Sequence, residues 1–299
     1  MLKVVLCFAL LCAALAQAPY FTFTTDVLDF TQKPTFELLI NATSGATKKI
    51  SELPMEKPAS IYPGQCVYNR YTNEFVVTTE NVDKDYTVDL TTLDAKTGVV
   101  KKVTSTHKMT HLEIDDTNHN IYGIGYVEET DTWNFVYYNQ TTNEITPQFP
   151  IKGLPMLGIS TYCQKCRKLF FATIDDEGDF RIIGVDPLEM KVFSDAKPPA
   201  YPSALEMDST KGILYAVLNY NLVSIVVQLD VKSGEVIRQI TDLPINYNVF
   251  DTLYDPSIKT MYISCKNLQE ESKLIAVNME TGKYVFSDEL SYTLHCLDK

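Results

Sequence analysis

The sequence has few long apolar stretches and few basic residues, and each shortage argues against a class of function. After the run from Val4 to Leu15, no stretch is long and apolar enough to cross a bilayer, so a membrane span is not expected. Lys and Arg number 26 against 38 Asp and Glu, which gives a formal net charge of −12. Such a chain repels nucleic acid and anionic membrane surfaces and favours cations or basic partners, although acidity also simply keeps a secreted protein soluble.

The N-terminus has the pattern of a secretory signal peptide. Lys3 supplies a positive start, the apolar run follows, and small residues end it at Ala14 to Ala18. Cleavage after Ala16 is expected, because Pro19 would lie just past a cut after Ala18. The sequence also lacks linkers and low-complexity segments. We therefore expect residues 1–16 to be removed and residues 17–299 to form a single secreted, extracellular domain.

An internal repeat predicts the fold. A short apolar strand followed by a turn recurs about 43 to 48 residues apart along the chain. These first turns occur at Asn69, Asp115, Cys163, Asp208, Asp255 and Asp298. A run rich in β-branched and aromatic residues, such as Met261 to Ser264, follows each of the first five, as expected of a strand.

A second series of turns follows the third strand of each repeat, at Asn41, Asp94, Asn139, Asp186, Asp230 and Asn278. Asx side chains close local turns onto their own backbone, and a Gly or Asn four residues later accepts the positive φ that ends the turn. Only Met190 departs from this type. The pattern predicts an all-β protein, a six-bladed β-propeller with four-stranded antiparallel blades.

The two ends of the chain supply parts of one blade. Strands at about Phe21–Val27 and Thr35–Ile40 lack a first strand, and the chain ends on an unpartnered one, Tyr292–Leu297. Pairing these pieces completes the sixth blade and closes the ring, which removes exposed sheet edges. An open solenoid is the alternative, and it would leave both pieces unpaired.

The repeats resemble those of six-bladed propellers, but they do not resemble one particular family. Segments such as Leu229 to Val236 and Val277 to Lys283 are similar to repeats in several of these proteins. Trp-Asp blade endings, paired-glycine kelch motifs, Tyr-Trp-Thr-Asp and Asp-box signatures are absent. Because this fold hosts enzymes and binding modules alike, the resemblance implies architecture and leaves function open.

Both turn series are expected on one face of the disc. The two N-glycosylation sequons begin at Asn41 and Asn139, in turns of the second series. Glycans there would leave the opposite face open for ligands. That open face carries acidic loops, and the densest of them contains Asp175, Asp176 and Asp179. These carboxylates are a candidate Ca²⁺ site, with a solvated hairpin tip as the alternative.

Aromatic residues on rigid loops of the open face are candidate ligand contacts. Tyr62, Tyr201 and Tyr247 each lie beside or near proline in a loop between blades, where a ring can support a glycan or a peptide. Structural packing of tyrosine is the alternative.

The central channel is where a catalytic site is expected. Secreted propellers of the paraoxonase, gluconolactonase and strictosidine synthase kinds supply a ring of Asp, Asn and Glu there, usually holding calcium. Here Asp251 is the only carboxylate near the expected height, and His111 could pair with it as acid and base. Glu113 and Glu206 lie slightly deeper, and strand alternation is expected to turn them to another face.

The cysteines indicate at least one structural disulfide. Cys163 and Cys166 flank a turn and are expected to be bonded, whereas a redox dithiol would normally open a helix of an α/β fold. Cys66 and Cys296 lie on neighbouring inner strands and are candidates to pair. Cys265 would then be free or intermolecular, so a monomer is expected, with a disulfide-linked dimer as the alternative.

Three functions fit these features. The leading hypothesis is a non-catalytic extracellular propeller that binds a protein, a glycan or a cation such as Ca²⁺. The second is a Ca²⁺-dependent hydrolase of the lactonase or arylesterase kind, with its site in the channel. The third is a structural matrix component.

Overall fold

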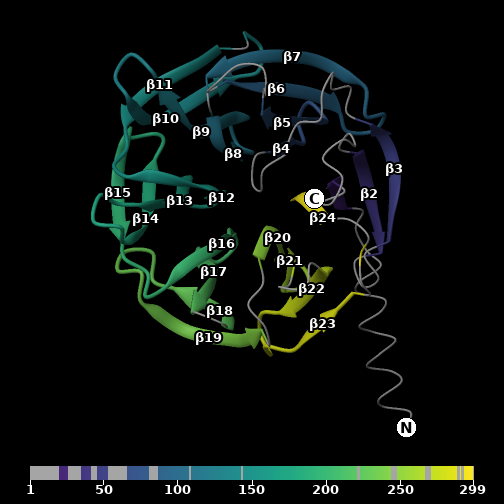
Figure 1. Ribbon diagram of the computed structural model, residues 1–299, viewed down its shortest axis with the longest axis vertical. Coiled ribbons are helices and arrows are strands. Elements are labelled where there is room, and N and C mark those ends of the chain that lie inside the picture. The colour runs from purple at the N-terminus through teal and green to yellow at the C-terminus, as the bar shows by residue number, and fades with distance from the viewer. Residues whose placement is uncertain are drawn as a thin grey trace.

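The computed structural model places 24 β-strands, β1 to β24, around a central axis (Figure 1). It describes residues 20–25, 35–41, 46–52, 66–80, 87–107, 109–142, 144–220, 223–243, 248–266, 271–287, 290 and 293–298. The expected signal peptide, residues 1–16, lies outside the described residues. Among the described residues there is no helix with the length and apolar character needed to cross a membrane.

Five four-stranded antiparallel blades are each built from strands consecutive in the chain. The first contains β4 (Cys66–Asn69), β5 (Glu74–Glu80), β6 (Thr87–Asp94) and β7 (Val100–His107). The second contains β8 (Met109–Asp115), β9 (Asn120–Val127), β10 (Thr132–Asn139) and β11 (Glu144–Pro150). The third contains β12 (Leu154–Cys163), β13 (Lys168–Ile174), β14 (Phe180–Asp186) and β15 (Lys191–Ala196).

The last two continuous blades repeat this order. One contains β16 (Tyr201–Asp208), β17 (Ile213–Tyr220), β18 (Val223–Leu229) and β19 (Val236–Leu243). The other contains β20 (Asn248–Asp255), β21 (Thr260–Lys266), β22 (Ser272–Asn278) and β23 (Tyr284–Phe286). The first strand of every blade lies nearest the axis and the fourth lies at the rim (Figure 1). The all-β propeller predicted from the repeat is confirmed, with five blades rather than six built from consecutive strands.

The two ends of the chain meet in a composite sheet. Its order is β24-β1-β2-β3, with β1 at Tyr20–Thr25, β2 at Thr35–Asn41, β3 at Ala46–Glu52 and β24 at Thr293–Asp298. β24 pairs antiparallel with β1, with Phe23 opposite His295 and Thr25 opposite Thr293. β24 also packs against β20 and β4 of the neighbouring blades. The expected pairing of the terminal strands is therefore present, whereas an open solenoid would leave both of them unpaired.

The Asx turns form as predicted. Asp94 Oδ1 accepts hydrogen bonds from the N–H groups of Lys96 and Thr97, and Asp230 Oδ1 does the same for Lys232 and Ser233. Met190 takes the position that glycine occupies in related turns, and its φ is 52°, in the left-handed region. The turn geometry therefore persists even where a side chain makes it less favourable.

Both turn series lie on one face of the disc, which we call the turn face. The opposite face, where the inner strands begin and where the Asp175–Asp179 hairpin lies, we call the loop face. The sheets pack against one another through apolar side chains from adjacent blades. Phe170 from β13 and Leu205 from β16, for example, belong to one buried cluster between two blades. The inner strands themselves line the axis, with both polar and apolar side chains.

Buried polar side chains also join the blades at the turn face. Arg167 donates two hydrogen bonds to Asp115 of the preceding blade, with N···O distances of 2.9 and 2.7 Å. The hydroxyl of Tyr254 donates to Asp208, again of the preceding blade, at 3.2 Å. Each Asp therefore caps its own turn and accepts from the next blade, which holds the inner strands in fixed relative positions.

Candidate binding site in the central channel

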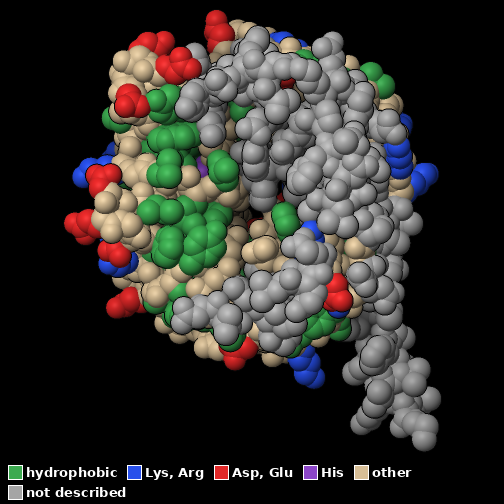
Figure 2. All heavy atoms as spheres, in the orientation of Figure 1, with side chains coloured by type: hydrophobic (Ala, Val, Ile, Leu, Met, Phe, Trp, Pro, Cys, Tyr) green, Lys and Arg blue, Asp and Glu red, His purple; other side chains and the backbone are tan. Residues whose placement is uncertain are grey.

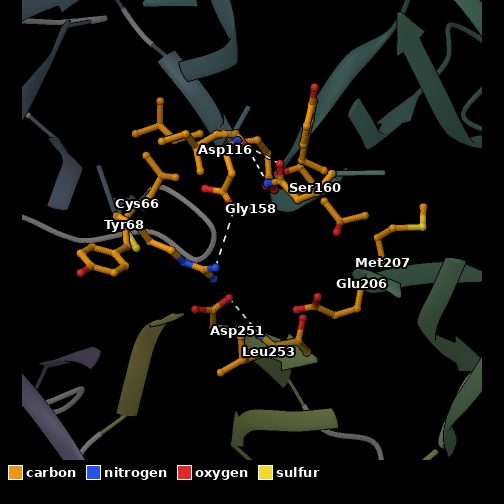
Figure 3. A pocket seen from close by; sticks show the side chains of 18 residues that line it. Cys66, Tyr68, Asp116, Gly158, Ser160, Glu206, Met207, Asp251 and Leu253 are labelled. Atoms are coloured by element: carbon orange, nitrogen blue, oxygen red, sulfur yellow. Dashed lines mark hydrogen bonds and ion pairs between the residues drawn. The ribbon is translucent and has the colours of Figure 1, made fainter. Parts of the chain in front are cut away.

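The axis of the propeller contains a cavity of about 190 Å³ lined by residues of the inner strands and the turns that follow them. Its described acidic side chains come from three blades: Glu113 of β8 and Asp116 of the turn that follows it, Glu206 of β16 and Asp251 of β20. Figure 3 shows the labelled side chains of Glu206, Asp251, Asp116 and Ser160 around one space, with Ser160 beside Asp116. We call this cavity the throat.

Strand alternation was expected to turn Glu113 and Glu206 to a different face from Asp251. This expectation was wrong, because both line the throat together with Asp251. Four inner strands, β8, β12, β16 and β20, carry an irregularity near their starts, between Thr110 and Glu113 in β8 and between Val249 and Asp251 in β20, for example. An extra residue there reverses the alternation counted from the strand start. Counted back from the following turn, the three carboxylates are an even number of residues away and face the same side. Counting from the turn would have found them.

Hydrogen bonds position several of these groups. The Ser160 hydroxyl donates to Glu113 Oε1 at 2.7 Å, and the Thr252 N–H donates to Asp251 Oδ1 at 2.8 Å. At the turn-face end, Arg70 and Asp116 form an ion pair with a separation of 3.7 Å. Arg70 is the one basic residue among the described lining residues, against four carboxylates. The described wall of the throat is therefore strongly acidic.

A second cavity, of about 230 Å³, lies where the inner strands begin at the loop face. We call it the mouth. Its wall contains Leu157, Tyr201 and Phe250, together with the polar side chains of Ser203, Asn219 and Asn248. The mouth and the throat share Gly158, Asp251 and Thr252, so they are neighbours along the axis, and we call the two together the passage.

Apolar side chains gather beside the mouth, over the starts of β12 and β16 (Figure 2). Leu154, Leu157 and Tyr201 are 57%, 40% and 38% exposed there. The ring of Tyr201 packs edge-on against Phe180, with centroids 5.2 Å apart. The structure thus places Tyr201 at the mouth, as a ligand contact requires. Tyr62 and Tyr247, the other two tyrosines proposed as ligand contacts, lie outside the described residues.

His111 does not belong to the channel. It lies in the irregular part of β8 with φ of 60°, and its side chain is fully buried between blades. Its Nε2–H donates to the Met156 carbonyl at 2.6 Å, so Nδ1 is the acceptor and the Thr110 hydroxyl donates to it. Burial lowers the pKa of His111 to about 4. The expected acid–base pair of His111 and Asp251 is therefore wrong, because the bulge turns the imidazole of His111 into the blade interface.

The acidic hairpin on the loop face is organised by its own hydrogen bonds. Asp175 Oδ1 accepts from the N–H groups of Glu177 and Asp179, and Asp179 forms an ion pair with Lys197. Among the described side chains, no three His, Cys, Asp or Glu are arranged to hold one metal ion, and this includes Asp175, Asp176 and Asp179. The geometry matches the alternative, a solvated hairpin tip.

The cysteines behave largely as expected. Cys163 and Cys166 are disulfide-bonded, which confirms the structural staple in this turn. Cys66 is also in a disulfide. Cys265 is free and fully buried, and burial raises the pKa of its thiol. A disulfide-linked dimer through Cys265 is therefore not favoured.

The Asn139 sequon has a geometry compatible with glycosylation. Asn139 Oδ1 accepts from the N–H groups of Thr141 and Thr142, which points the other side-chain atom, Nδ2, away from the turn. Nδ2 is the atom to which a glycan attaches. The side chain of Asn41 is outside the described residues.

Comparisons with known proteins support the fold and do not select a function. No protein-family model matches the chain, and no curated protein matches its sequence. By structure, it is similar to TolB from Acinetobacter baumannii, with a TM-score of 0.66 and 9% identity, over 95% of this chain and 65% of that one. The chain thus spans less than two thirds of TolB.

Two further solved structures have the same general architecture. A quinoprotein alcohol dehydrogenase-like protein from Bacteroides thetaiotaomicron has a TM-score of 0.59 and 9% identity, over 93% of this chain and 77% of that one. A protein of Bacteroides uniformis, provisionally assigned as a 6-phosphogluconolactonase, has a TM-score of 0.56 and 13% identity, over 93% and 83%. At these identities the likeness concerns the fold alone.

Proposed function

We propose that this protein is an exported, non-catalytic binding protein whose ligand occupies the passage along the propeller axis. The observation that carries the proposal is that two cavities, the mouth and the throat, adjoin along the axis at Gly158, Asp251 and Thr252. Concave sites with an apolar rim and a few convergent polar groups are typical of small-molecule binding. This differs from the expectation that the acidic hairpin tips bind the ligand.

The described residues favour binding over catalysis. Ser160 is the candidate nucleophile in the throat, and its hydroxyl donates to Glu113 rather than to an imidazole. Among the described lining residues of both cavities there is no histidine. A general base with a pKa near neutrality is the usual means of activating a serine.

A ligand-observed NMR screen tests the proposal. A panel of neutral, cationic and anionic fragments would be screened against the purified mature protein and against a Ser160→Trp variant whose indole fills the throat. Lys232→Trp, on an exposed turn, is the matched control. We expect at least one fragment class to bind wild type and Lys232→Trp but not Ser160→Trp. If no fragment binds, or if Ser160→Trp changes nothing, the passage is not the binding site.

Export is part of the proposal. Its support is the signal-like sequence of residues 1–16 and the two sequons at Asn41 and Asn139. Expression of the full chain in secretory cells should give a protein in the medium that begins at Gln17. Treatment with a peptide-N-glycosidase should lower its mass, and Asn139→Gln should remove one glycan. Retention inside the cells with an intact N-terminus would contradict export.

We further propose that the composite sheet acts as a sixth blade and closes the ring. The support is its four-stranded order, with β24 at the inner position held by β4, β8, β12, β16 and β20 in the other sheets. Hydrogen exchange measures this directly. The amides of β24 and β1 should be protected together in the full chain, and deletion of residues 292–299 should expose β1.

A Ca²⁺-dependent hydrolase is the second candidate, because carboxylates from three blades line the throat. A lactone and an aryl ester, each assayed with and without chelator, distinguish the two functions. Turnover that is lost with chelator and in Asp251→Asn would favour the enzyme. No turnover of either substrate, together with fragment binding that depends on the throat, would favour the binding protein.

A further inference from the structure

The loop face carries an apolar patch beside the mouth, over the starts of β12 and β16 (Figure 2). Leu154 and Leu157 of β12 and Tyr201 of β16 are exposed there. Leu157 and Tyr201 also line the mouth, a cavity of about 230 Å³. Exposed apolar surface beside a pocket is typical of a protein interaction site, because the pocket can take an anchoring side chain of the partner.

An acidic hairpin tip, residues 175–179, stands against this patch. It begins directly after Ile174, which is opposite Leu154 in the pairing of β13 with β12. Phe180 follows the tip and packs edge-on against Tyr201, with ring centroids 5.2 Å apart. Both ends of the acidic tip therefore join apolar residues that belong to the patch or contact it.

A second acidic tip, residues 128–131 between β9 and β10, lies beside the start of β12. The N–H of Ile151 donates to the carbonyl of Trp133 in the same hairpin, at 2.8 Å. Ile151 is three residues before Leu154 in the sequence. The patch is therefore next to acidic tips from two neighbouring blades.

The charge beside the patch is strongly negative. The two tips contain seven carboxylates and no Lys or Arg, and Asp176 and Glu177 are exposed. Asp and Glu side chains stand along the outer margin of the same view (Figure 2). Two cations come from nearby loops between blades: Lys152 is exposed, and Lys197 forms an ion pair with Asp179. The remaining excess of negative charge attracts a basic partner and speeds its association.

We propose that the loop face docks an extended, basic segment of another protein. One apolar side chain of that segment lies in the mouth, and its Lys or Arg side chains reach the two acidic tips. The methylene stems of Lys and Arg can cover apolar surface while their charged ends meet carboxylates, so they suit a patch of this kind. This goes beyond the proposed function, because it concerns the surface around the mouth and needs no ligand in the throat.

The charge argues against two other occupants of the patch. A second copy of this chain would bring the acidic tips of both copies together, because a two-fold dimer uses the same surface on each subunit. An anionic membrane would be repelled by the same carboxylates. A basic polypeptide complements both the apolar patch and the charge beside it.

A selection from random short peptides displayed on phage, carried out on the immobilised mature protein, tests the inference. We expect the enriched peptides to combine Lys or Arg with an aromatic or aliphatic side chain. The best of them would be synthesised with a fluorophore and its Kd measured by fluorescence anisotropy. Raised salt should weaken its binding, because part of the attraction is between charges.

Matched pairs of variants separate the patch from the general acidity of the chain. Leu154→Ser should weaken binding of the peptide about fivefold or more, whereas Leu188→Ser should change it less than about twofold. Both leucines are 57% exposed, but Leu188 lies on the turn face. Glu177→Lys should weaken binding about fivefold, and Glu235→Lys, an equal charge change on the turn face, less than about twofold. Thermal melts show which variants are folded, and Glu177→Lys keeps the test decisive if Leu154→Ser is not.

The opposite results overturn the inference. It fails if no peptide is enriched, if the enriched peptides lack basic residues, or if the loop-face variants bind as wild type does. If the protein co-sediments with phosphatidylcholine vesicles and Leu154→Ser prevents this, the patch contacts lipid instead. If analytical ultracentrifugation shows a dimer that Leu154→Ser dissociates, a second copy covers the patch. The proposed function is decided separately, by the fragment panel.

Discussion

At the scale of single residues, His111 couples the stability of the fold to pH. Its imidazole is neutral and fully buried, with Nδ1 accepting from Thr110 and Nε2–H donating to Met156. Burial lowers its pKa to about 4, whereas in the unfolded chain the pKa is near the ordinary value of 6.5. Protons therefore bind the unfolded chain preferentially between these two values.

The free energy of unfolding should consequently fall as the pH drops from about 6.5 to about 4. The contribution of this one residue is about 3 kcal/mol, fully present above pH 6.5 and lost below pH 4. Urea unfolding at a series of pH values measures it. His111→Gln should be less stable at neutral pH but should show a shallower slope in this window. An unchanged slope in His111→Gln would show that other groups cause the acid sensitivity.

Met190 offers a gain in stability at a single position. Its φ of 52° is unfavourable for a residue with a Cβ, and its side chain is 42% exposed, so little packing depends on it. Met190→Gly should raise the free energy of unfolding by up to about 1 kcal/mol, because glycine adopts this conformation without strain. Met190→Ala keeps the Cβ and is the control. Equal effects of the two substitutions would contradict the conformational explanation.

At the scale of the secondary-structure elements, the first turn of each blade does more than reverse the chain. Asp208 is 1% exposed, and its Oδ1 accepts from the N–H groups of Thr210 and Lys211, at 3.0 and 3.2 Å. Its Oδ2 accepts from Tyr254 of the next blade. The same side chain therefore closes a turn and fastens two blades.

Asp208→Ala should cost about 2 to 4 kcal/mol, because it removes a turn cap and leaves the buried Tyr254 hydroxyl without this acceptor. Asp230→Ala is the matched control, because Asp230 closes a similar turn without a described bond to the next blade. It should cost about 1 kcal/mol. Chemical denaturation of both variants gives the loss in free energy of unfolding. The same measurement on Tyr254→Phe, with and without Asp208→Ala, gives the share of that loss that comes from the hydrogen bond between the blades.

The sequence predicted these elements well because their signals are local. An Asx residue with glycine four positions later determines its turn largely by its own hydrogen bonds, as Asp94 and Asp230 do. The throat was less predictable. Whether Glu206 faces Asp251 depends on an irregularity between Pro202 and Ala204, where one extra residue is accommodated against β17. No residue type marks that bulge, so the side of β16 on which Glu206 lies could be predicted only by counting back from Asp208.

At the scale of the whole molecule, a disulfide is expected to close the ring covalently. Cys66 of β4 is in a disulfide, Cys163 is bonded to Cys166, and Cys265 is free. The remaining cysteines are Cys7 and Cys12, in the expected signal peptide, and Cys296, on β24. β24 packs against β4, so Cys296 is the partner we expect.

Peptide mapping of the unreduced secreted protein should therefore recover a Cys66–Cys296 pair. Because this bond would enclose most of the chain, its loss should lower the free energy of unfolding by up to about 5 kcal/mol in the chain-entropy view. The double variant Cys66→Ala with Cys296→Ala measures the cost, and Cys163→Ala with Cys166→Ala, which opens only a short loop, should cost much less. A mixed disulfide or a free Cys296 would disprove the pairing.

The position of β24 at the inner edge of the composite sheet has a consequence for biogenesis. The five continuous blades can each fold as they leave the ribosome, but the sheet that starts with β1 must wait until β24, far along the chain, has been translated. Until Thr293–Asp298 arrives, the hydrogen-bonding edge of β1 that it covers is open to other chains. Strand exchange between newly made molecules should therefore occur at this edge more readily than at the inner strands of the continuous blades.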